Sequence, residues 1–334
     1  MRNVRFWEPE NGTVRCLVCP RECRIPEGQR GFCRVRENRG GELVLLTYGK
    51  SSGAVPDPVE KKPLFHYKPG SRTYSIGTVG CNLRCLHCQN WQISQASPEE
   101  VPLEDLPPET IVKRARATGC DSVSFTYNEP VINLEYTVDT FELCKREGLG
   151  TVYVTNGFMR EETAAFLSRY LEAANVDLKA FTERFYREVC GGSLEPVLRT
   201  LKTWKSNGVH VEVTTLVIPG HNDSEEEARE IAAWIRDELG PETPWHVSRF
   251  HPDYKMLDVP PTPVETVERF VRIGYDEGLY YVYVGNVPGH KYENTYCPNC
   301  GALLVERRGF TVLRINLEPG PRCPECGARQ YFVL

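Results

Sequence analysis

The chain has 334 residues and a formal net charge of −5. A chain of this length buries a large core and favours one barrel-sized unit with small appendages, while its acidic balance argues against broad, non-specific nucleic-acid binding but not against a local basic surface. No run of about 18 uninterrupted apolar residues occurs, and residues 1–12 contain no apolar signal core. We therefore expect a cytoplasmic protein without a membrane span.

Fourteen cysteines would suit disulfides in a small secreted protein, but eleven of them form three clusters with the spacing of metal ligands. The first cluster has the irregular pattern C-x2-C-x3-C-x9-C and lies in a predicted N-terminal extension, residues 1–70. Its members are Cys16, Cys19, Cys23 and Cys33. Four cysteines so close together suit zinc, and they would also supply the four ligands of an auxiliary iron-sulfur cluster. We favour zinc, because no coordination site needs to stay free for a substrate.

Residues 71–290 alternate between β-prone and helical patterns. The β-prone stretches predict strands at 73–79, 121–126, 150–155, 174–178, 209–217, 244–249 and 280–285. Apolar residues at spacings of three and four predict helices at 109–118, 132–147, 160–172, 194–207, 224–238 and 263–276. This alternation implies an α/β fold with a parallel sheet, which right-handed crossovers wrap into a full or partial barrel. Its chemistry should lie at the C-terminal ends of the strands.

The second cysteine cluster directly follows the first predicted strand of this unit. Cys81, Cys85 and Cys88 have CxxxCxxC spacing in the run GTVGCNLRCLHCQNW. A four-iron cluster takes four thiolates, so a loop with three leaves one iron open, much as catalytic zinc sites keep one position free. The alternative interpretation is a zinc site with His87 or a distant cysteine as its fourth ligand.

Polar side chains also follow the strands after this one, each at the end where its strand finishes. A lone His or Asn at such a place usually caps a helix or completes a turn, so their shared position is the stronger evidence for a site. These residues are Tyr127, Asn128, Glu129, Thr155, Asn156, Gly157, Asp177, Lys179, His221 and Asp223; the strand at 244–249 itself carries His246, with Arg249 and His251 close behind.

The three-cysteine loop resembles the cluster loop of radical S-adenosylmethionine (SAM) enzymes. NEP, VTNGF, VDLK, VIPGHND and PWH then follow in the order seen in pyruvate formate-lyase activating enzymes. The resemblance implies a partial (β/α)6-type TIM barrel, a [4Fe-4S] cluster on the three cysteines, and bound SAM. It implies that the surroundings of SAM are His87, Asn128, Glu129, Thr155, Asn156, Lys179 and His246, with His87 beside the adenine and Glu129 at the amino group.

Three positions depart from this family pattern. Asn128 replaces a glycine, so a main-chain contact to SAM is expected to become a side-chain contact. Val154 stands where the activating enzyme has an Asp, and Thr214 stands where it has an Arg. A cation site and a carboxylate contact found in that enzyme are therefore expected to be missing here.

Over about residues 14–290 the chain resembles one branch more closely, the radical SAM component of the AmmeMemoRadiSam system. The resemblance rests on CLVCPRECRIPEGQRGFCRVRENRGGEL, DPVEKKPLFHYKPGS, YNEP and WHVSRFHPDYK. It implies Memo-like and AMMECR-type partner proteins and an electron donor such as ferredoxin or flavodoxin. No substrate follows from it.

The third cysteine cluster predicts a zinc ribbon over residues 291–334, with VLRINL as a β-hairpin arm. Its paired C-x2-C knuckles are Cys297, Cys300, Cys323 and Cys326. A unit this small cannot hold a core unaided, so the metal supplies folding energy and the ribbon is expected to be separable from the barrel. Its arginines would suit nucleic acid or an acidic partner, but an ordinary solvated surface suits them equally well. They are Arg307, Arg308, Arg314, Arg322 and Arg329.

Three functions are compatible with these patterns. The first is a radical SAM enzyme whose 5'-deoxyadenosyl radical abstracts hydrogen from an unidentified substrate, and the second is an activase that acts on a glycine of a partner enzyme. An activase needs an open barrel mouth, whereas the N-terminal extension and the ribbon would be able to close it over a smaller molecule. The third is a non-catalytic metal-dependent binding protein, which would not need the motifs at the strand ends.

Of the cysteines outside the clusters, Cys144 is expected to be an apolar filler and Cys190 to be buried or in a turn.

Overall fold

A computed structural model describes residues 4–334. At its centre is an eight-stranded sheet with the order β15-β14-β13-β12-β11-β10-β8-β7, in which only β7 (Gly53–Pro58) runs antiparallel to its neighbour. The parallel strands are β8 (Arg72–Gly77), β10 (Ser122–Phe125), β11 (Gly150–Thr155), β12 (Ala173–Asp177), β13 (His210–Val217), β14 (Trp245–Arg249) and β15 (Val282–Gly285). Each begins and ends within two residues of its predicted range, which confirms an α/β fold with a parallel sheet.

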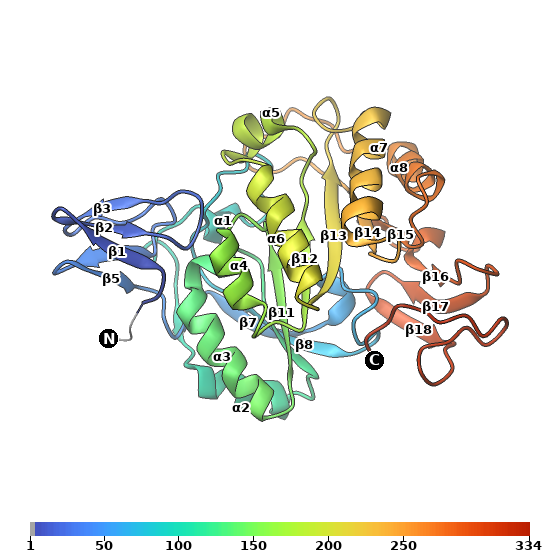
Figure 1. Ribbon diagram of the computed structural model, residues 1–334, viewed down its shortest axis with the longest axis horizontal. Helices are drawn as coiled ribbons and strands as arrows, with labels where there is room; N and C mark the ends of the chain where they lie inside the picture. The colour runs from blue at the N-terminus through green and yellow to red at the C-terminus, as the bar shows by residue number, and fades with distance from the viewer. Residues whose placement is uncertain (1–3) are drawn as a thin grey trace.

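Helices connect the parallel strands and pack against the sheet (Figure 1). They are α2 (Pro108–Ala117), α3 (Leu134–Arg146), α4 (Glu161–Leu167), α6 (Glu195–Ser206), α7 (Glu225–Trp234) and α8 (Val264–Asp276). Proline in the first turn starts α2 and α6, and the Ser224 hydroxyl accepts the Glu227 N–H at the start of α7. Helix α4 ends before the predicted 172, because the chain turns after Leu167 and buries Leu171 from outside the helix.

Shorter helical segments complete the connections. They are α1 (Trp91–Ser94), α5 (Glu183–Phe185), the 3-10 segments η1 (Val59–Lys61), η2 (Pro130–Asn133) and η5 (Lys291–Glu293), and the π-type segments η3 (Tyr186–Cys190) and η4 (Ile235–Leu239). Within residues 4–334, the helices are all too short or too polar to cross a lipid bilayer.

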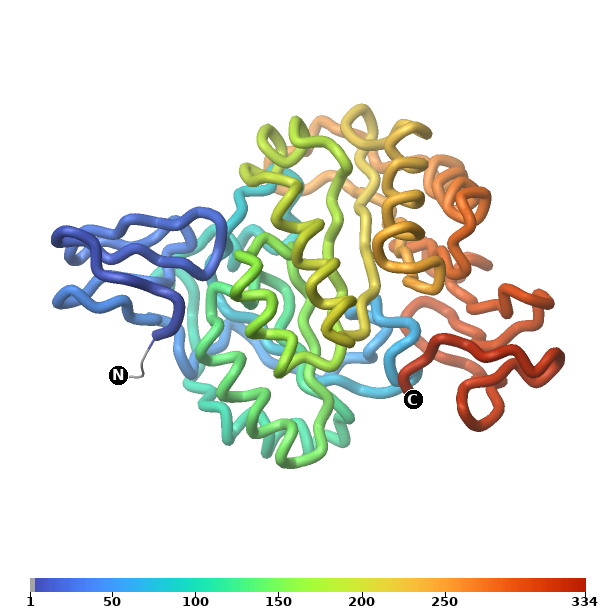
Figure 2. Tube along the Cα trace, in the orientation of Figure 1, coloured from blue at the N-terminus to red at the C-terminus, as the bar shows by residue number. Residues whose placement is uncertain are grey.

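Two small β units lie at opposite ends of the molecule (Figures 1 and 2). The N-terminal unit contains β1 (Trp7–Glu10), β2 (Thr13–Cys16), β3 (Arg24–Pro26), β4 (Arg36–Arg39) and β5 (Glu42–Leu45), and β6 (Lys50–Ser51) pairs with β9 (Glu104–Asp105). The C-terminal unit is β16 (Thr295–Tyr296), β17 (Leu303–Arg308) and β18 (Thr311–Ile315). The boundaries at 70 and 290 stay predictions, and β7, from within 1–70, belongs to the central sheet.

The segment after β7 and the C-terminal unit together cover the N-terminal ends of the parallel strands. Glu212 on β13 accepts the N–H groups of Phe65 and His66, at 3.0 and 2.7 Å. Arg307 donates to the Phe65 carbonyl at 2.7 Å, and the Val333 N–H donates to the His66 carbonyl at 2.8 Å. The C-terminal unit therefore packs on the base of the sheet and does not close its mouth, contrary to the arrangement considered from the sequence.

Candidate active site

A cavity of about 430 Å³ lies at the carboxyl ends of the parallel strands, where α/β sheets bind ligands. Its volume is within the range of roughly 300–1,000 Å³ that is usual for small-molecule sites. Every residue predicted for the central cluster and for SAM lines it, with the exception of His246. These residues are Cys81, Cys85, His87, Cys88, Asn128, Glu129, Thr155, Asn156 and Lys179.

The loop that carries Cys81, Cys85 and Cys88 is fixed to the segment that ends at Cys190. The Arg84 N–H donates to the Cys190 carbonyl at 2.9 Å, and the Arg84 guanidinium donates to the Cys81 carbonyl at 2.8 Å. Cys190 is fully buried and its thiol is hydrogen-bonded with Cys85. The prediction that Cys190 is buried is confirmed, and its sulfur lies against the loop.

Asn128 holds the chain that leads into this loop. Its Nδ2 donates to Thr78 Oγ1 and to the Gly80 carbonyl, both at 2.9 Å, and its Oδ1 accepts the Thr78 N–H at 2.9 Å. Both N–H groups of the amide are therefore used within the protein. The two N–H groups hold the residues before Cys81, and the contact of Asn128 with SAM stays a prediction.

Glu129 joins the ends of β10 and β11. Its Oε1 accepts from Thr155 Oγ1 at 2.7 Å and from the Val131 N–H at 3.0 Å, and its Oε2 accepts from the Asn156 N–H at 2.9 Å. Burial raises the pKa of Glu129 to about 7, although these donors act in the opposite direction. A carboxylate accepts about four hydrogen bonds, so Oε2 can take one more donor from a ligand.

Asn156 connects this carboxylate with the cysteine loop. Its side-chain Nδ2 donates to Asn82 Oδ1 at 2.9 Å and contacts Cys81 Sγ at 3.6 Å. The TNG sequence thus does two things in the fold: its backbone binds Glu129 and its side chain orients the first cysteine.

Lys179 supplies a fixed positive charge to the cavity. Its Nζ pairs with Asp177 at 2.8 Å. Burial acts to lower the pKa of Lys179, but the negative charges of Asp177, Cys85 and Cys190 together outweigh it and raise the pKa above the usual range. The amine is therefore charged at neutral pH.

Two buried polar atoms of the cavity have no hydrogen-bond partner among residues 4–334. They are His87 Nδ1 and Thr214 Oγ1. Burial lowers the pKa of His87 to about 3, so the ring is neutral. Buried polar atoms are normally paired, so both atoms fit a bound ligand. Thr214 and Val154 both line the cavity at the positions where the sequence departs from the family.

A further group of cavity residues comes from the strip DPVEKKPLFHYKPGS, and reasoning from the sequence assigned it no role. Lys62 is 1% exposed, and its Nζ donates to Asp57 at 2.7 Å. The Tyr127 hydroxyl donates to the same carboxylate at 2.5 Å. Burial lowers the pKa of Lys62 to about 8. Lys61, Lys62 and Tyr127 all line the cavity, and the resemblance of this strip to one enzyme branch was the signal available in the sequence.

His246 lies outside this cavity. It is 2% exposed on β14, and its Nε2 is 2.6 Å from Glu212 Oε2 in the base of the sheet. Its ring stacks on Tyr283 with 5.2 Å between centroids. Ser248, two residues further along the same strand, reaches the cavity instead, because side chains on one face of a strand recur every second residue.

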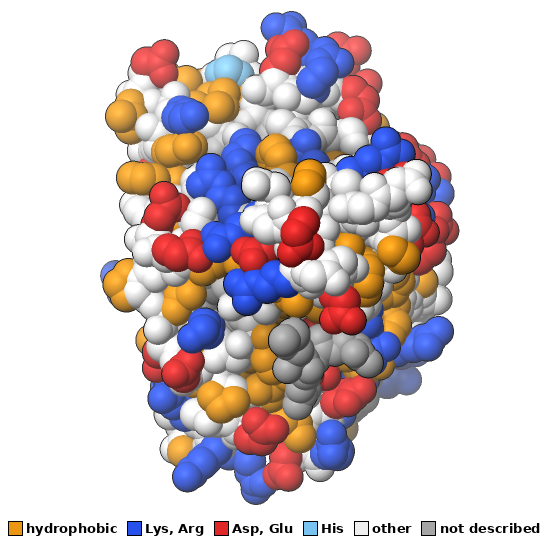
Figure 3. All heavy atoms as spheres, turned by 90° about the vertical axis from the view of Figure 1, so that its left-hand side faces the viewer, with side chains coloured by type: hydrophobic (Ala, Val, Ile, Leu, Met, Phe, Trp, Pro, Cys, Tyr) orange, Lys and Arg blue, Asp and Glu red, His pale blue; other side chains and the backbone are white. Residues whose placement is uncertain are grey.

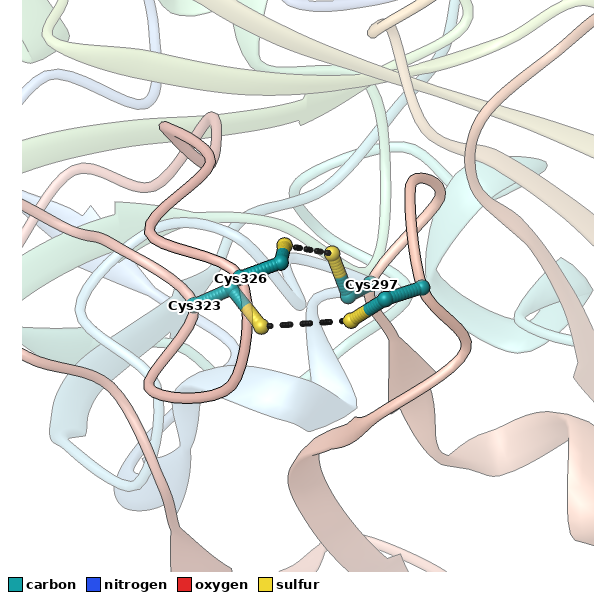
Figure 4. A group of neighbouring side chains, drawn as sticks. Cys297, Cys323 and Cys326 are labelled. Atoms are coloured by element: carbon teal, nitrogen blue, oxygen red, sulfur yellow. Dashed lines mark hydrogen bonds between the residues drawn. The ribbon is translucent and has the colours of Figure 1, made fainter.

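The C-terminal cysteines converge as the sequence predicts. The Sγ atoms of Cys297, Cys300, Cys323 and Cys326 all lie within 4.8 Å of one another. Figure 4 shows Cys297 and Cys326 facing each other, with their sulfurs 3.7 Å apart, and the Cys300 and Cys323 sulfurs are 3.6 Å apart. Four thiols at these distances are a suitable set of ligands for one metal ion.

The arginines of the C-terminal unit differ in exposure. The Arg307 side chain is buried against the base of the sheet, whereas Arg308, Arg314, Arg322 and Arg329 are exposed.

The N-terminal cysteines also converge. Cys16, Cys19, Cys23 and Cys33 line one small cavity together with Arg21 and Arg36. Cys144, which was expected to be a filler, is fully buried in the main core.

Comparison with known proteins places this site in a family. The family model of the Radical SAM superfamily matches residues 75–234. The chain is 48% identical over 336 residues to the uncharacterized protein MJ0808 of Methanocaldococcus jannaschii, with 100% of both chains covered. It is 30% identical over 207 residues to the pyruvate formate-lyase 1-activating enzyme of Escherichia coli (strain K12), with 57% of this chain and 83% of the relative covered.

A solved structure supports the same fold. The crystal structure of a radical SAM methyltransferase from Sphaerobacter thermophilus superimposes with a TM-score of 0.51 at 19% identity, over 70% of this chain and 71% of that one. Taken with the sequence relatives and with the cysteine loop at the mouth of the sheet, the chain belongs to the radical SAM superfamily and is related to pyruvate formate-lyase activating enzymes.

Proposed function

We propose that the protein binds a [4Fe-4S] cluster through Cys81, Cys85 and Cys88, with SAM in the adjoining cavity. The convergence of the three thiols and the strand-end residues on one cavity carries this proposal. When bound, the cluster and SAM supply reductive cleavage of SAM to methionine and a 5'-deoxyadenosyl radical, which abstracts hydrogen from a substrate that is not yet identified.

The side chains of the cavity divide the work of holding SAM. Glu129 Oε2 would accept a hydrogen bond from the SAM ammonium group, and the charged Lys179 would attract its carboxylate. The neutral ring of His87 would serve the adenine, and its unpartnered Nδ1 would take a hydrogen bond there. Asn128 and Asn156 keep the cysteine loop in place through the contacts already described, and the buried setting limits access of water.

We also propose that the enzyme is the radical SAM component of an AmmeMemoRadiSam system in the cytoplasm. Its Memo-like and AMMECR-type partners and a ferredoxin or flavodoxin donor follow from that proposal. The strip from Asp57 to Ser71 supports it, because this part of the resemblance supplies Lys61 and Lys62 to the cavity wall. Zinc in the ribbon is the corresponding proposal for the C-terminal cysteines.

A glycyl-radical activase is the second candidate. Relatives in Escherichia coli and Clostridium pasteurianum are named pyruvate formate-lyase activating enzymes. The ribbon lies at the base and leaves the mouth accessible from that side, as an activase would require.

Anaerobic reconstitution tests the proposal. We expect the wild-type protein to cleave SAM to 5'-deoxyadenosine under reduction, and the triple variant with Ala at 81, 85 and 88 to lose that activity and about four iron atoms. Cys144→Ala is the matched control, because this thiol is fully buried and belongs to none of the three cysteine groups. Full iron content in the triple variant would contradict the proposal. A glycine-centred radical in a partner enzyme, detected by electron paramagnetic resonance, would favour the activase.

A further inference from the structure

Two lysines in the wall of the cavity, Lys61 and Lys62, have no part in holding the cluster or SAM. Strand β7 runs towards the base of the sheet, because Pro58 at its end pairs with Arg72, the first residue of β8. The lysines follow directly after β7 and approach the cavity from the base, whereas the cysteine loop follows the other end of β8. Residues from both ends of the parallel strands therefore meet in one cavity.

One carboxylate serves both lysines. Asp57 Oδ1 accepts from Lys61 Nζ at 2.9 Å, and Asp57 Oδ2 accepts from Lys62 Nζ at 2.7 Å. Both amines are charged at neutral pH, since even the pKa of Lys62, which burial lowers, is about 8. Among residues 4–334, no second carboxylate forms an ion pair with either lysine. The pair therefore keeps one positive charge that no neighbouring carboxylate balances, whereas Lys179 has Asp177 to itself.

Lys62 also has hydrogen-bond donors to spare. An ammonium group has three N–H donors, and the one hydrogen bond that Lys62 Nζ makes within the described chain goes to Asp57. The ring of Tyr127 covers part of the amine, with 4.6 Å between Nζ and the ring centroid. A buried charge is costly unless it is paired and hydrogen-bonded. The remaining donors therefore fit an acceptor that enters the cavity.

Lysines and arginines on the surface do not meet these conditions. Figure 3 shows them on the face that carries the N-terminal unit, where Asp and Glu side chains lie among them. Lys50 is a comparable lysine outside the cavity, because it pairs with Asp105 at 2.9 Å and the two side chains are 41% and 85% exposed. Solvent satisfies the spare donors of such a lysine, whereas Lys62 is 1% exposed.

Tyr127 connects the lysine pair with the cysteine loop. Its hydroxyl donates to Asp57, and its carbonyl accepts from the side chain of Asn90 at 2.8 Å, two residues after Cys88. The φ of Tyr127 is +71°, in the left-handed region that bulky residues rarely adopt. Such a backbone persists only where its surroundings hold it, and it is common at ligand sites. A group bound to Lys62 would therefore share the cavity with the proposed cluster and SAM.

We propose that Lys62, assisted by Lys61, binds an anionic oxygen group of the substrate, which is a carboxylate or a phosphate. The inference rests on the proposed function and names the class of substrate for the same cavity. An anion on Lys62 balances the spare positive charge and accepts the spare N–H groups. Holding one end of the substrate in this way positions the rest of the molecule for hydrogen abstraction.

Binding of small anions tests the proposal before the substrate is known. Acetate and inorganic phosphate are the probes, and acetamide is the neutral analogue of acetate. Each is titrated by calorimetry into the reconstituted full chain saturated with SAM. We expect a Kd of about 1–10 mM for at least one anion and at least tenfold weaker binding of acetamide. The tighter anion identifies the group as carboxylate or phosphate. No binding of either anion up to about 50 mM would overturn the proposal.

A variant tests whether Lys62 holds the anion. Lys62→Met should bind the tighter anion at least about tenfold more weakly and SAM within about twofold of the wild type. Lys50→Met is the matched control and should bind the anion as the wild type does. Unchanged anion affinity in Lys62→Met would overturn the proposal. An equal loss of SAM affinity would also overturn it, because Lys62 would then hold the carboxylate of SAM.

Two further variants apply if Lys62→Met does not fold. Asp57→Asn with Lys62→Met removes both charges of the buried pair, and Lys61→Met changes a side chain that is 41% exposed. Each should bind the anion at least about threefold more weakly, and wild-type affinity in either would overturn the proposal.

Iron content and SAM cleavage of the same wild-type sample test the proposed function separately. A protein with about four iron atoms that cleaves SAM but binds neither anion would refute this inference alone. A protein that binds an anion at Lys62 but holds no iron would refute the proposed function instead.

Discussion

The two four-cysteine groups lie at opposite ends of the molecule and differ in what their sulfurs enclose (Figure 1). The C-terminal sulfurs are packed within 4.8 Å of one another, whereas the N-terminal thiols line a void. Each group has four thiols and contains at least one C-x2-C pair. Four thiols that are close together in the chain are therefore arranged differently at the two ends of the molecule, because the fold around each group differs.

The two groups also contact different ends of the parallel strands. The N-terminal group meets the mouth through Arg21 and Gly80, beside the proposed radical cluster. The C-terminal unit meets the base through Arg307 and Phe332, which stacks on His66 with 4.2 Å between centroids. One group therefore lies beside the cavity and the other lies at the opposite end of the strands.

The largest expected effect comes from removing the ribbon metal with Cys297→Ser and Cys323→Ser. Structural zinc supplies about 10–16 kcal/mol in zinc-finger peptides, so the ribbon should unfold and the barrel should melt at a lower temperature. Iron content and SAM cleavage at low temperature should persist, because the ribbon lies away from the mouth. Metal analysis and circular dichroism measure both. Loss of iron instead of zinc would contradict the proposal of zinc at the C-terminal cysteines.

Arg307→Ala should have the next largest effect. The side chain of Arg307 is fully buried, 3.9 Å from Glu60, and donates to the Phe65 carbonyl. Removing one partner of a buried ion pair costs about 3–5 kcal/mol of unfolding free energy, measurable by urea denaturation. The exposed neighbour Arg308→Ala is the control and should change stability by less than about 0.5 kcal/mol. If both variants changed the free energy of unfolding equally, the C-terminal unit would not stabilise the base of the sheet. That outcome would fit the separable ribbon expected from the sequence.

Arg21→Ala tests the corresponding contact at the mouth. Its loss leaves the carbonyls of Asn82 and Gly191 without this donor, at a cost of about 1–3 kcal/mol. We expect faster loss of iron from the central cluster on exposure to a chelator. Arg24→Ala, whose side chain is 69% exposed, should behave as the wild type. An unchanged rate in the Arg21 variant would remove the link between the two cysteine groups.

The smallest effect is the pH dependence of SAM affinity. Burial raises the pKa of Glu129 from 4.5 to about 7. Protonated Glu129 therefore contributes to the folding stability of the free protein below pH 4.5, and this contribution is lost as the pH rises from 4.5 through 7. SAM binding needs the ionised form, so affinity should rise about tenfold, or about 1.4 kcal/mol, between roughly pH 6 and 7.5.

Glu129→Gln should bind SAM more weakly and without this pH dependence, as measured by equilibrium binding to the reconstituted protein. The variant without the ribbon metal should retain the pH dependence of SAM affinity, because the ribbon contacts only the base. The Arg21 variant should shift this pH dependence, because a chain of hydrogen bonds connects Arg21 with Glu129 through Asn82 and Asn156. A dependence that persists in Glu129→Gln would assign the titration to another group.

Much of the architecture follows from local sequence. The seven parallel strands and the long helices were predictable, because buried parallel strands are continuous β-prone runs and amphipathic helices repeat every three to four residues. The cysteine loop, NEP, TNG and DLK were predictable as rim residues, because each directly follows a strand. His246 was assigned to SAM by the family resemblance alone; it lies near the start of β14, and its side chain does not line the cavity.

The order of the parallel strands, the three-thiol loop and the two four-cysteine groups can be read from the chain alone, since spacing along the chain fixes which ligands are available. The place of Lys62 in the cavity, the burial of Arg307 at the base and the meeting of the four N-terminal cysteines at one cavity emerge only in the folded molecule. These features depend on contacts between segments far apart in the chain, and the distance between two sulfurs is set by the packing of the backbone that carries them, which no local pattern records.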